Sequence, residues 1–575
     1  MRPTTGRTAA LALATAATAS LLGSASADAT PGPLADPTAA ALSWGACEGT
    51  GLDPRQECAT LTVPLDHRDP GGKRISLAVS RIPSERPQAR RGTLLLIPGG
   101  PGSTGLERPS TLGKRLPRSV RDAYDIVSFD PRGMGRSTHT GCGLDTGDLS
   151  LLASRPWPAP GGDITQNVTT GRRIADTCAR NGGQLLRTIS TVNEARDIDS
   201  IRRALGERKL SAWGVSYGTY VGSVYAQMFP EHTDRWVLDS NDDPDPERVE
   251  RRWLANYAVG VEDTFPDFAA WASAPNSPVR LAGTPDGVRS RVLDLAARLD
   301  AEPLPWPGAN PPELNGNALR QSMLNALYSR DDFEDLARLI VDADAGKAPG
   351  AAPADPPQDA AAVSLATICN DVEWPTSVPD YARDVAASRK SHPLTAGMPV
   401  NVTPCSFWHD TPRDKPVRIT DQGPSNVLLV QNKRDVATPY SGALNLRRAY
   451  GDRARMVSVD AMGHGAAYVV NNGSACADRK VTDFLLKGSG RSTMCSAGEE
   501  RGGEERDTHL MNVRRPAPCR RGGALHGQPA QRRSGVRMPS RVMPCRSVRA
   551  VMSHRKRRFS TWDGPPSAFR TGHWS

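Results

Sequence analysis

A serine flanked by two glycines is the sharpest chemical signal in the sequence. Gly214-Val215-Ser216-Tyr217-Gly218 follows the apolar run LSAWGV and precedes TYVGSVYAQM, so the pattern predicts a strand, a tight turn and a helix. Such a turn presents the serine hydroxyl at the carboxyl edge of a sheet, where ligands of open α/β sheets bind. This motif also occurs by chance in a chain with 53 glycines. The inference that Ser216 is a nucleophile therefore rests on the flanking strand and helix.

Asp435 and His464 are placed to activate that serine. A serine hydroxyl needs a general base, and the base needs an orienting carboxylate. On a turn of this type the acid and then the base follow the serine in the chain, each after a strand. Asp435 follows NVLLVQN, and His464 follows ARMVSVD as the only one of ten histidines between Asp435 and the C-terminal tail. The alternatives are that Asp435 is a turn carboxylate and His464 a surface histidine. The placement of both residues after strands, in this order, favours an acid and a base.

The segment IPGGPGSTG predicts backbone donors for an oxyanion. Attack on a carbonyl creates a negative oxygen that needs N–H groups set in place beforehand. We expect one donor at Gly100 and the other at Tyr217, the residue after the nucleophile. A phosphate-binding loop is the competing interpretation, but Pro101 interrupts it and no Lys-Ser or Lys-Thr follows.

The segments around these residues predict an α/β sheet. LTVPLDH and ISLAVSRI, separated by the turn DPGGKR, are typical of a β-hairpin. The apolar runs in GTLLLIPGGPG and YDIVSFDPRGMGRS are typical of parallel strands buried on both faces. Residues 193–205 have helical spacing, and sheet character returns at SNVLLVQN and ARMVSVD before a last helix in VTDFLLKG. Alternating strands and helices favour a mostly parallel sheet flanked by helices.

This alternation stops between residues 242 and 412. Tryptophans occur there among amphipathic stretches such as ALRQSMLNALYSRDDFEDLARLI and a linker rich in Pro and Ala, GKAPGAAPADPPQD. We interpret this segment as a helical cap inserted into the sheet domain.

The N-terminus is typical of an exported protein. Arg2 and Arg7 precede a run of small apolar residues that ends in Ala25-Ser26-Ala27, which predicts a signal peptide over 1–27. A membrane anchor is the alternative, but the run is too short and too rich in Ala and Thr to span a bilayer. We expect a secreted, extracellular protein with a linker over 28–45 and no stable membrane anchor.

Cysteine usage agrees with export, because disulfides persist outside the reducing cytoplasm. Eight cysteines precede residue 496, and their spacing permits sequential pairs, although the sequence leaves the connectivity open. Metal binding is the rival interpretation, but no CxxC or HxxxH spacing occurs. We expect no metal and no cofactor. The eight residues are Cys47, Cys58, Cys142, Cys178, Cys369, Cys405, Cys476 and Cys495.

The basic charge belongs to the C-terminal tail. Residues 496–575 hold 17 Arg and Lys against 6 Asp and Glu, a net charge of +11, which leaves −1 for the rest of a chain whose net charge is +10. The catalytic part therefore has no basic bias that would indicate a nucleic-acid partner. The tail has few aliphatic residues and predicts disorder. Binding to polyanions or to a cell wall is the alternative for it.

Several motifs together resemble a known family. IPGGPG, DPRGMGRS with Asp130 and Arg132, GVSYGTYVG, the D-x-x-T-P at Asp435 and the GHG at His464 are similar to those of secreted tripeptidyl aminopeptidases and proline iminopeptidases. The resemblance runs from about Cys47 to Cys495. It implies an α/β-hydrolase core over 46–241 and 413–495, the latter resembling the terminal module of the tripeptidyl enzymes, with the cap over 242–412.

Two departures from the family pattern are present. Pro98 stands where many proline iminopeptidases have a histidine before the glycines, which favours the tripeptidyl branch. The family has nothing that matches the basic tail over 496–575.

The resemblance implies a serine exopeptidase that acts on peptides with a free N-terminus and releases short peptides, usually tripeptides. The substrate amine would need a carboxylate partner, because a buried ammonium without one is costly. Asp371 and Glu373 in CNDVEWP are the candidates, and solvated surface charges are the alternative. A carboxylesterase with the same three residues is the first rival function, and a binding protein on a hydrolase scaffold is the second. The sequence indicates no oligomeric state.

Overall fold

A single large sheet organises the part of the protein that contains Ser216. The computed structural model describes residues 42–245, 254–347, 349–350, 352–468, 474–488 and 490–496. The expected leader (1–27), most of the expected linker (28–45) and nearly all of the basic tail (496–575) lie outside the described residues, as do residues 246–253 of the expected cap.

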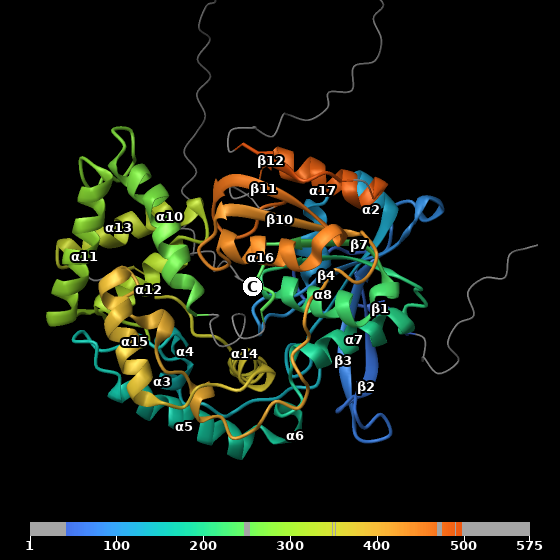
Figure 1. The fold of residues 1–575 in the computed structure, drawn as a ribbon, viewed down its shortest axis with the longest axis horizontal. Helices are drawn as coiled ribbons and strands as arrows, with labels where there is room; N and C mark the ends of the chain where they lie inside the picture. The colour runs from blue at the N-terminus through green and yellow to red at the C-terminus, as the bar shows by residue number, and fades with distance from the viewer. Residues whose placement is uncertain are drawn as a thin grey trace, which may run out of the picture. The chain divides into compact units, whose positions relative to one another are not determined.

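Ten strands of the described residues form this sheet in the order β1-β2-β3-β5-β4-β6-β7-β10-β11-β12 (Figure 1). Neighbouring strands among the first four, β1, β2, β3 and β5, pair antiparallel. From β5 onward to β12, each strand in this order pairs parallel with the next. The bounds are Gly45–Ala46 (β1), Glu57–Pro64 (β2), Arg74–Ile82 (β3), Gly92–Ile97 (β4), Tyr124–Phe129 (β5), Leu210–Val215 (β6), Thr233–Asp239 (β7), Val427–Arg434 (β10), Ala454–Met462 (β11) and Thr493–Cys495 (β12).

The sequence patterns explain these pairings. The predicted hairpin is formed by β2 and β3, which pair from Glu57 with Arg81 to Pro64 with Arg74. All six residues of β4 are buried, as expected of a parallel strand covered on both faces. The predicted sheet class is therefore confirmed, while β1 and β12 at the two edges are too short to show a pattern in the sequence.

Helices cover both faces of the sheet. Leu95 and Ile97 of β4 pack with α7 (Thr191–Ala204), α8 (Tyr217–Met228) and α16 (Tyr440–Tyr450). Leu94 and Leu96 face the other way, toward α2 (Arg118–Ala123) and α17 (Ala475–Lys487). Alternate side chains of one strand thus enter two separate cores, as the period of two in a strand requires.

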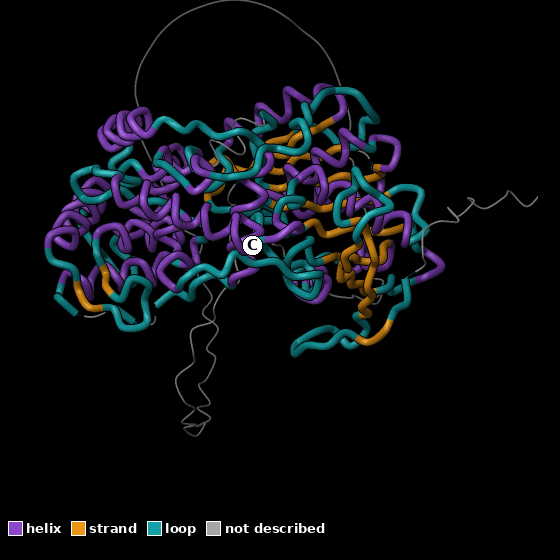
Figure 2. Tube along the Cα trace, turned by 90° about the horizontal axis from the view of Figure 1, so that it is seen from below, coloured by secondary structure: helices purple, strands orange, loops and turns teal. Residues whose placement is uncertain are grey.

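Six longer helices of the described residues lie between β7 and β10, and the first four of them form a further core with their neighbours. The fifth and sixth pack in smaller clusters outside that core. Figure 2 shows this mainly helical part at the left and the strands among helices at the right. The stretch ALRQSMLNALYSRDDFEDLARLI contains α12 and α13 on either side of a short turn, as its amphipathic pattern indicates. The bounds are Asn256–Ser273 (α10), Pro285–Ala301 (α11), Gly316–Ala326 (α12), Phe333–Asp344 (α13), Gln358–Asp371 (α14) and Val378–Ser391 (α15).

One further long helix, α5 (Thr165–Asn181), and several short elements complete the described fold. Several of them, from α3 to α6, precede α7 and pack near α14 and α15 (Figure 1). The remaining bounds are Arg108–Thr111 (α1), Thr146–Leu149 (α3), Leu151–Ser154 (α4), Thr165–Asn181 (α5), Gly183–Leu186 (α6), Leu304–Pro305 (β8), Glu313–Leu314 (β9), and the 3-10 turns Pro87–Ala89, Gly113–Arg115, Pro230–His232, Arg330–Asp332, Met398–Val400, Pro404–Phe407 and Gly451–Arg453.

Among the described residues, four disulfides each join a cysteine to the next cysteine along the chain. They pair Cys47 with Cys58, Cys142 with Cys178, Cys369 with Cys405, and Cys476 with Cys495. The last one connects the start of α17 to β12, which lies beside β11. Within the described ranges, none of the helices combines the length and the apolar character needed to cross a bilayer.

The order of the parallel strands, the antiparallel hairpin at one edge and the helical insertion after β7 are those of the α/β-hydrolase fold. The loops that follow β4, β6, β7, β10 and β11 all leave the sheet at its carboxyl edge. These five loops carry the residues described next.

Candidate active site

Ser216 lies on the turn between β6 and α8. Its backbone has φ of 60° and ψ of −132°, a conformation that L-residues rarely adopt and that is often found at functional turns. A Cβ atom on Gly214 would lie 2.4 Å from the carbonyl oxygen of Gly218, and one on Gly218 would lie 2.8 Å from the carbonyl oxygen of Ile97. Packing alone therefore requires both glycines, and it presses the turn against the end of β4.

Asp435 and His464 meet at the ends of β10 and β11. The Nδ1 atom of His464 lies 2.9 Å from Oδ1 and 3.1 Å from Oδ2 of Asp435. The carboxylate is 1% exposed and also accepts hydrogen bonds from the backbone N–H groups of Ala437 and Thr438 at 3.0 and 2.9 Å. These polar contacts fix the position of Asp435, and the hydrogen bond to Asp435 orients the imidazole ring of His464.

The two groups shift each other's pKa. Burial alone would raise the pKa of Asp435, but the charge and the hydrogen bond of His464, with the N–H of Thr438 and the side chain of Ser240, hold it below its ordinary value. Burial alone would lower the pKa of His464, yet the charge and hydrogen bond of Asp435 raise it. The pair therefore favours a carboxylate beside an imidazole that readily takes a proton.

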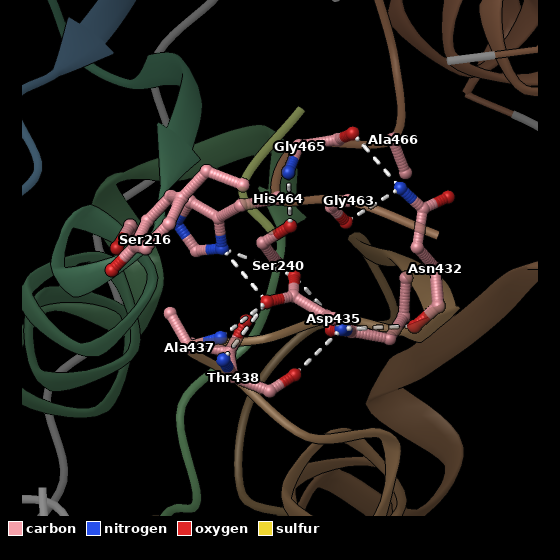
Figure 3. Close-up of polar contacts among 12 residues, drawn as sticks. Ser216, Ser240, Asn432, Asp435, Ala437, Thr438, Gly463, His464, Gly465 and Ala466 are labelled. Carbon is pink, nitrogen blue, oxygen red and sulfur yellow. Dashed lines mark hydrogen bonds and ion pairs between the residues drawn. The ribbon is translucent and has the colours of Figure 1, made fainter. Parts of the chain in front are cut away.

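Ser216 lies next to the His464 ring (Figure 3). Because Nδ1 of His464 faces Asp435, the remaining ring nitrogen, Nε2, is left for the serine hydroxyl or for a substrate. The structure brings together the three residues that the sequence nominated from three separate loops. Their arrangement is suited to transfer of a proton from a hydroxyl to an imidazole.

The end of β7 contacts the loops that carry Ser216 and His464. The carbonyl oxygen of Asp239 accepts the N–H of Ser216 at 3.1 Å. The Asp239 carboxylate accepts the N–H groups of Ala466 and Ala467 at 2.8 and 2.7 Å, just after His464. Burial raises the pKa of Asp239 to about 7, although these two N–H groups lower it. Sequence reasoning missed this residue, because an Asp at the end of a buried strand carries no motif.

Ser240 is the next residue of that segment. Its hydroxyl accepts the N–H of Gly465 at 2.7 Å, and its backbone has φ of 60°, in the left-handed region (Figure 3). Behind it, the side-chain amide of Asn432 donates to the carbonyl oxygens of Gly463 and Gly465 at 2.9 and 3.0 Å. The side chains of Ser240 and Asn432, which lie outside the loop that carries His464, thus hold that loop from two sides.

The proposed oxyanion donors lie on adjoining segments. Gly100 has φ of 109°, and a Cβ atom there would lie 2.8 Å from the backbone nitrogen of Gly102. Tyr217 is the first residue of α8, where the backbone N–H groups of a helix have no partner within the helix. Since Gly218 packs against the backbone of Ile97 and Pro98, the glycine loop after β4 borders the start of α8.

The side chain of Tyr217 is anchored away from Ser216. Its hydroxyl lies 2.7 Å from Oγ1 of Thr191 and 3.3 Å from Oε2 of Glu194. Glu194 is buried, and burial together with the charges of Asp197 and Asp371 raises its pKa to about 8. These contacts fix the first turn of α8.

The two candidate partners of a substrate amine differ in their surroundings. Asp371, at the end of α14, is 9% exposed, and its carboxylate accepts the N–H of Thr191 at 3.0 Å. Glu373 is exposed to solvent. The structure therefore places Asp371 beside the residues that hold Tyr217, and it places Glu373 on the surface.

One side chain of the helical insertion, that of Tyr328, adjoins His464, and it connects to Tyr257 and to Arg155, which precedes the insertion in the chain. The ring of Tyr328 makes an edge contact with the imidazole at a centroid distance of 5.2 Å, and its carbonyl oxygen accepts the N–H of His464 at 2.9 Å. The hydroxyl of Tyr328 lies 2.6 Å from that of Tyr257, which accepts a hydrogen bond from Arg155 at 3.3 Å. No motif in the sequence predicts this contact, because the partners lie far apart in the chain.

No group of three or more His, Cys, Asp or Glu side chains suited to a metal ion occurs in the part of the chain that the structure describes.

Comparison with known proteins gives relatives over most of the chain. Family models described as "alpha/beta hydrolase fold" and "TAP-like protein" match residues 92–339 and 393–495. The chain is 31% identical over 474 residues to a tripeptidyl aminopeptidase of Streptomyces lividans, covering 78% of this chain and 85% of that protein.

Two mycobacterial proteins are also similar. Serine protease Hip1 of Mycobacterium tuberculosis is 28% identical over 459 residues, covering 75% of this chain and 85% of its own. Carboxylesterase B of the same organism is 29% identical over 488 residues, covering 80% of this chain and 90% of that protein.

Proposed function

Because the chain belongs to the tripeptidyl aminopeptidase family of α/β-hydrolase serine hydrolases, we propose that it is an exported exopeptidase that releases short peptides, chiefly tripeptides, from free N-termini. The observation that carries this proposal is the contact of His464 with Asp435 beside Ser216. That arrangement is suited to acyl transfer, and the family supplies the peptide substrate.

In the proposed mechanism the Ser216 hydroxyl oxygen attacks the peptide carbonyl while Nε2 of His464 takes the hydroxyl proton. Asp435 stabilises the imidazolium that forms. The imidazolium then gives its proton to the leaving amine as the C–N bond breaks, which leaves an ester on Ser216. Water, activated by His464 in the same way, hydrolyses this ester and restores the serine.

Two backbone N–H groups, those of Gly100 and Tyr217, are proposed to stabilise the oxyanion of each tetrahedral intermediate. The packing of the glycine loop against the start of α8 supports this assignment, since donors fixed in advance need no reorganisation during the reaction. Loss of one such donor typically costs about 3 to 4 kcal/mol of barrier.

For the substrate amine we propose Asp371 in preference to Glu373. Asp371 adjoins the Thr191 and Tyr217 side chains near the nucleophile turn, whereas Glu373 is exposed. The helices over 242–412 are proposed to form a cap that limits access to the core over 46–241 and 413–495. Asp371→Asn is expected to lower kcat/KM for substrates with a free amine, and Glu373→Gln to leave it unchanged.

Export is proposed from the leader over 1–27. Four disulfides support it, because such bonds persist in oxidising compartments. Mass spectrometry of the protein from the culture medium would test it, and an N-terminus at Asp28 is the expected result.

The proposed function predicts selectivity for a free N-terminus. Purified protein is offered Ala-Ala-Pro-aminocoumarin with a free amine and the same compound N-acetylated. Cleavage of only the free form is expected, since an exopeptidase recognises the amine. Equal cleavage of both would contradict the exopeptidase and indicate an endopeptidase-like site.

A second candidate function is a carboxylesterase with the same three residues, because one relative of similar identity is named Carboxylesterase B. The three residues determine that the reaction is acyl transfer, but they do not determine whether the leaving group is an amine or an alcohol. Hydrolysis of acetyl esters with no cleavage of either aminocoumarin peptide would favour the esterase.

A further inference from the structure

Arg155 is a cation near the candidate active site that the mechanism above does not use. Arg155 follows α4 in the chain, and the residues around it, Leu152 and Trp157, pack against the core of the helical insertion. Most described arginines of that insertion pair with a carboxylate. The pairs are Arg289 with Glu262, Arg291 and Arg298 with Asp344, Arg320 with Asp300, Arg338 with Glu334, and Arg383 with Asp380. Arg155 instead contacts neutral groups, donating from Nη1 to the Asn325 side-chain oxygen at 3.0 Å and from Nη2 to the Tyr257 hydroxyl at 3.3 Å.

The surroundings of Arg155 are partly enclosed. Arg155, Asn325 and Tyr328 are each half-buried, and Tyr257 is 1% exposed. The guanidinium lies 5.1 Å from the centre of the Tyr257 ring, which stabilises a cation without neutralising it. Within the described residues, Arg155 forms no ion pair. A half-buried guanidinium that retains its charge in this way is suited to bind an anion.

A chain of contacts leads from Arg155 to the catalytic imidazole. The Tyr257 hydroxyl joins that of Tyr328 at 2.6 Å, and the Tyr328 ring lies against His464. Because Nδ1 of His464 faces Asp435, its other nitrogen must deliver the proton to the leaving amine. In the proposed mechanism the leaving peptide would therefore start beside this nitrogen, and Tyr328 is the residue of the insertion that contacts the imidazole.

We propose that Arg155, with the hydroxyls of Tyr257 and Tyr328, binds the C-terminal carboxylate of a short leaving peptide. The site would make the enzyme favour oligopeptides in which one or two residues follow the scissile bond. This inference rests on the proposed exopeptidase function. It adds recognition of the C-terminal part of the substrate, which leaves first, to recognition of the N-terminal amine.

The test compares Ala-Ala-Pro-Ala and Ala-Ala-Pro-Ala-Ala, each with a free C-terminal carboxylate and as the C-terminal amide. All four peptides keep a free N-terminus. We expect kcat/KM of the wild-type protein to be about tenfold or more higher for the carboxylate of at least one pair, because a charge-assisted contact is lost in the amide. Ala-Ala-Pro-aminocoumarin, which has no carboxylate, serves as the internal reference.

Arg155→Gln is expected to abolish the preference and to change cleavage of the aminocoumarin substrate by less than about threefold, since the reference substrate does not use the site. Arg155→Lys should keep part of the preference, because it retains the charge but loses the planar fork. Arg289→Gln, which removes an ion-paired arginine from the helical insertion, is the matched control and should keep the whole preference.

The proposal is overturned if the wild-type protein shows no preference in either pair, or if Arg155→Gln retains it. It is equally overturned if both Arg155 variants slow all five substrates alike, because that result assigns Arg155 a structural role. Failure of the proposed function would look different, since the wild-type protein would then cleave none of the five.

Discussion

Each residue of the His464 and Asp435 pair changes the proton affinity of the other. The carboxylate raises the pKa of His464 above the ordinary value of about 6.5 for a histidine. His464 must be neutral to take the proton of Ser216, so activity is lost as the pH falls through this raised pKa. The acid limb of kcat/KM for the wild-type protein is therefore expected above pH 6.5, measured with the aminocoumarin peptide.

Asp435→Asn tests the same contact. We expect kcat to fall by about 10⁴-fold, because the orientation and the charge support of His464 are lost. The residual activity should have its acid limb at lower pH, since a neutral amide no longer raises the pKa of the imidazole. An unchanged acid limb would show that another group controls the titration.

Ser240 has a strained backbone, and its hydroxyl accepts a hydrogen bond from the loop that carries His464. Both Ser240→Ala and Ser240→Gly remove the acceptor of the Gly465 N–H, so both should lower kcat. Only glycine relieves the φ of 60°, so Ser240→Gly should be more stable than Ser240→Ala by about 1 kcal/mol.

Thermal unfolding of the two Ser240 variants, compared with their kcat values, checks this prediction. Equal melting temperatures would contradict the strain argument. Full activity in both variants would contradict a role of the hydroxyl in positioning His464.

At the scale of elements, the turn between β6 and α8 depends on a close approach to β4. A Cβ atom at Gly218 would lie 2.8 Å from the carbonyl oxygens of both Ile97 and Pro98. Gly218→Ala is therefore expected to displace the nucleophile turn from the glycine loop and to lower kcat/KM by about 100-fold or more, because a small misplacement of reacting groups costs that much.

Gly141→Ala is the matched control for Gly218→Ala. No atom lies within 4 Å of a Cβ built at Gly141, so this variant should keep wild-type activity and stability. Activity assays and melting temperatures of both variants make the comparison. Wild-type activity of Gly218→Ala would refute the packing argument.

The elements that could be predicted are those with strong local patterns. Buried strands such as β4 and β10, the hairpin of β2 and β3, and the turn at Ser216 all have apolar runs or glycines at fixed positions. The edge strand β12 could not be predicted, because its three residues have no pattern and its place depends on pairing with β11.

The same distinction applies to the site. Ser216, Asp435 and His464 were nominated because each follows a recognisable strand in a fixed order. Asp239, Ser240 and Tyr328 were not, since their contacts depend on how loops from different strands meet. Nothing in the sequence places the Ser240 hydroxyl opposite the N–H of Gly465.

At the scale of the whole molecule, buried carboxyl groups make stability depend on pH. Asp242 is 5% exposed, and burial, with the charges of Asp435 and Asp243, raises its pKa to about 7, against an opposing effect of His464. A carboxyl whose pKa is raised by folding binds its proton more tightly in the folded state. Its contribution to stability therefore falls as the pH rises from about 4 to about 7.

Asp242→Asn should remove this cost. At pH 8 the variant is expected to be more stable than the wild-type protein by about 1 to 4 kcal/mol, and at pH 5 the difference should be much smaller. Melting temperatures at both pH values measure it. Asp380→Asn, which changes an exposed carboxylate, is the control and should show no such trend.

A pH-independent difference between Asp242→Asn and the wild-type protein would contradict the assignment of this titration to Asp242. Lower stability of the variant at pH 8 would contradict it as well, because a buried charge would then be stabilising the fold.

The central claim is that Ser216 is a nucleophile activated by His464, and covalent labelling tests it most directly. The protein is treated with a fluorophosphonate, and the modified residue is identified by peptide mass spectrometry. We predict stoichiometric labelling of Ser216 in the wild-type protein, labelling slowed by orders of magnitude in His464→Ala, and none in Ser216→Ala. Labelling of another residue, or equal rates in the wild-type protein and His464→Ala, would contradict the account.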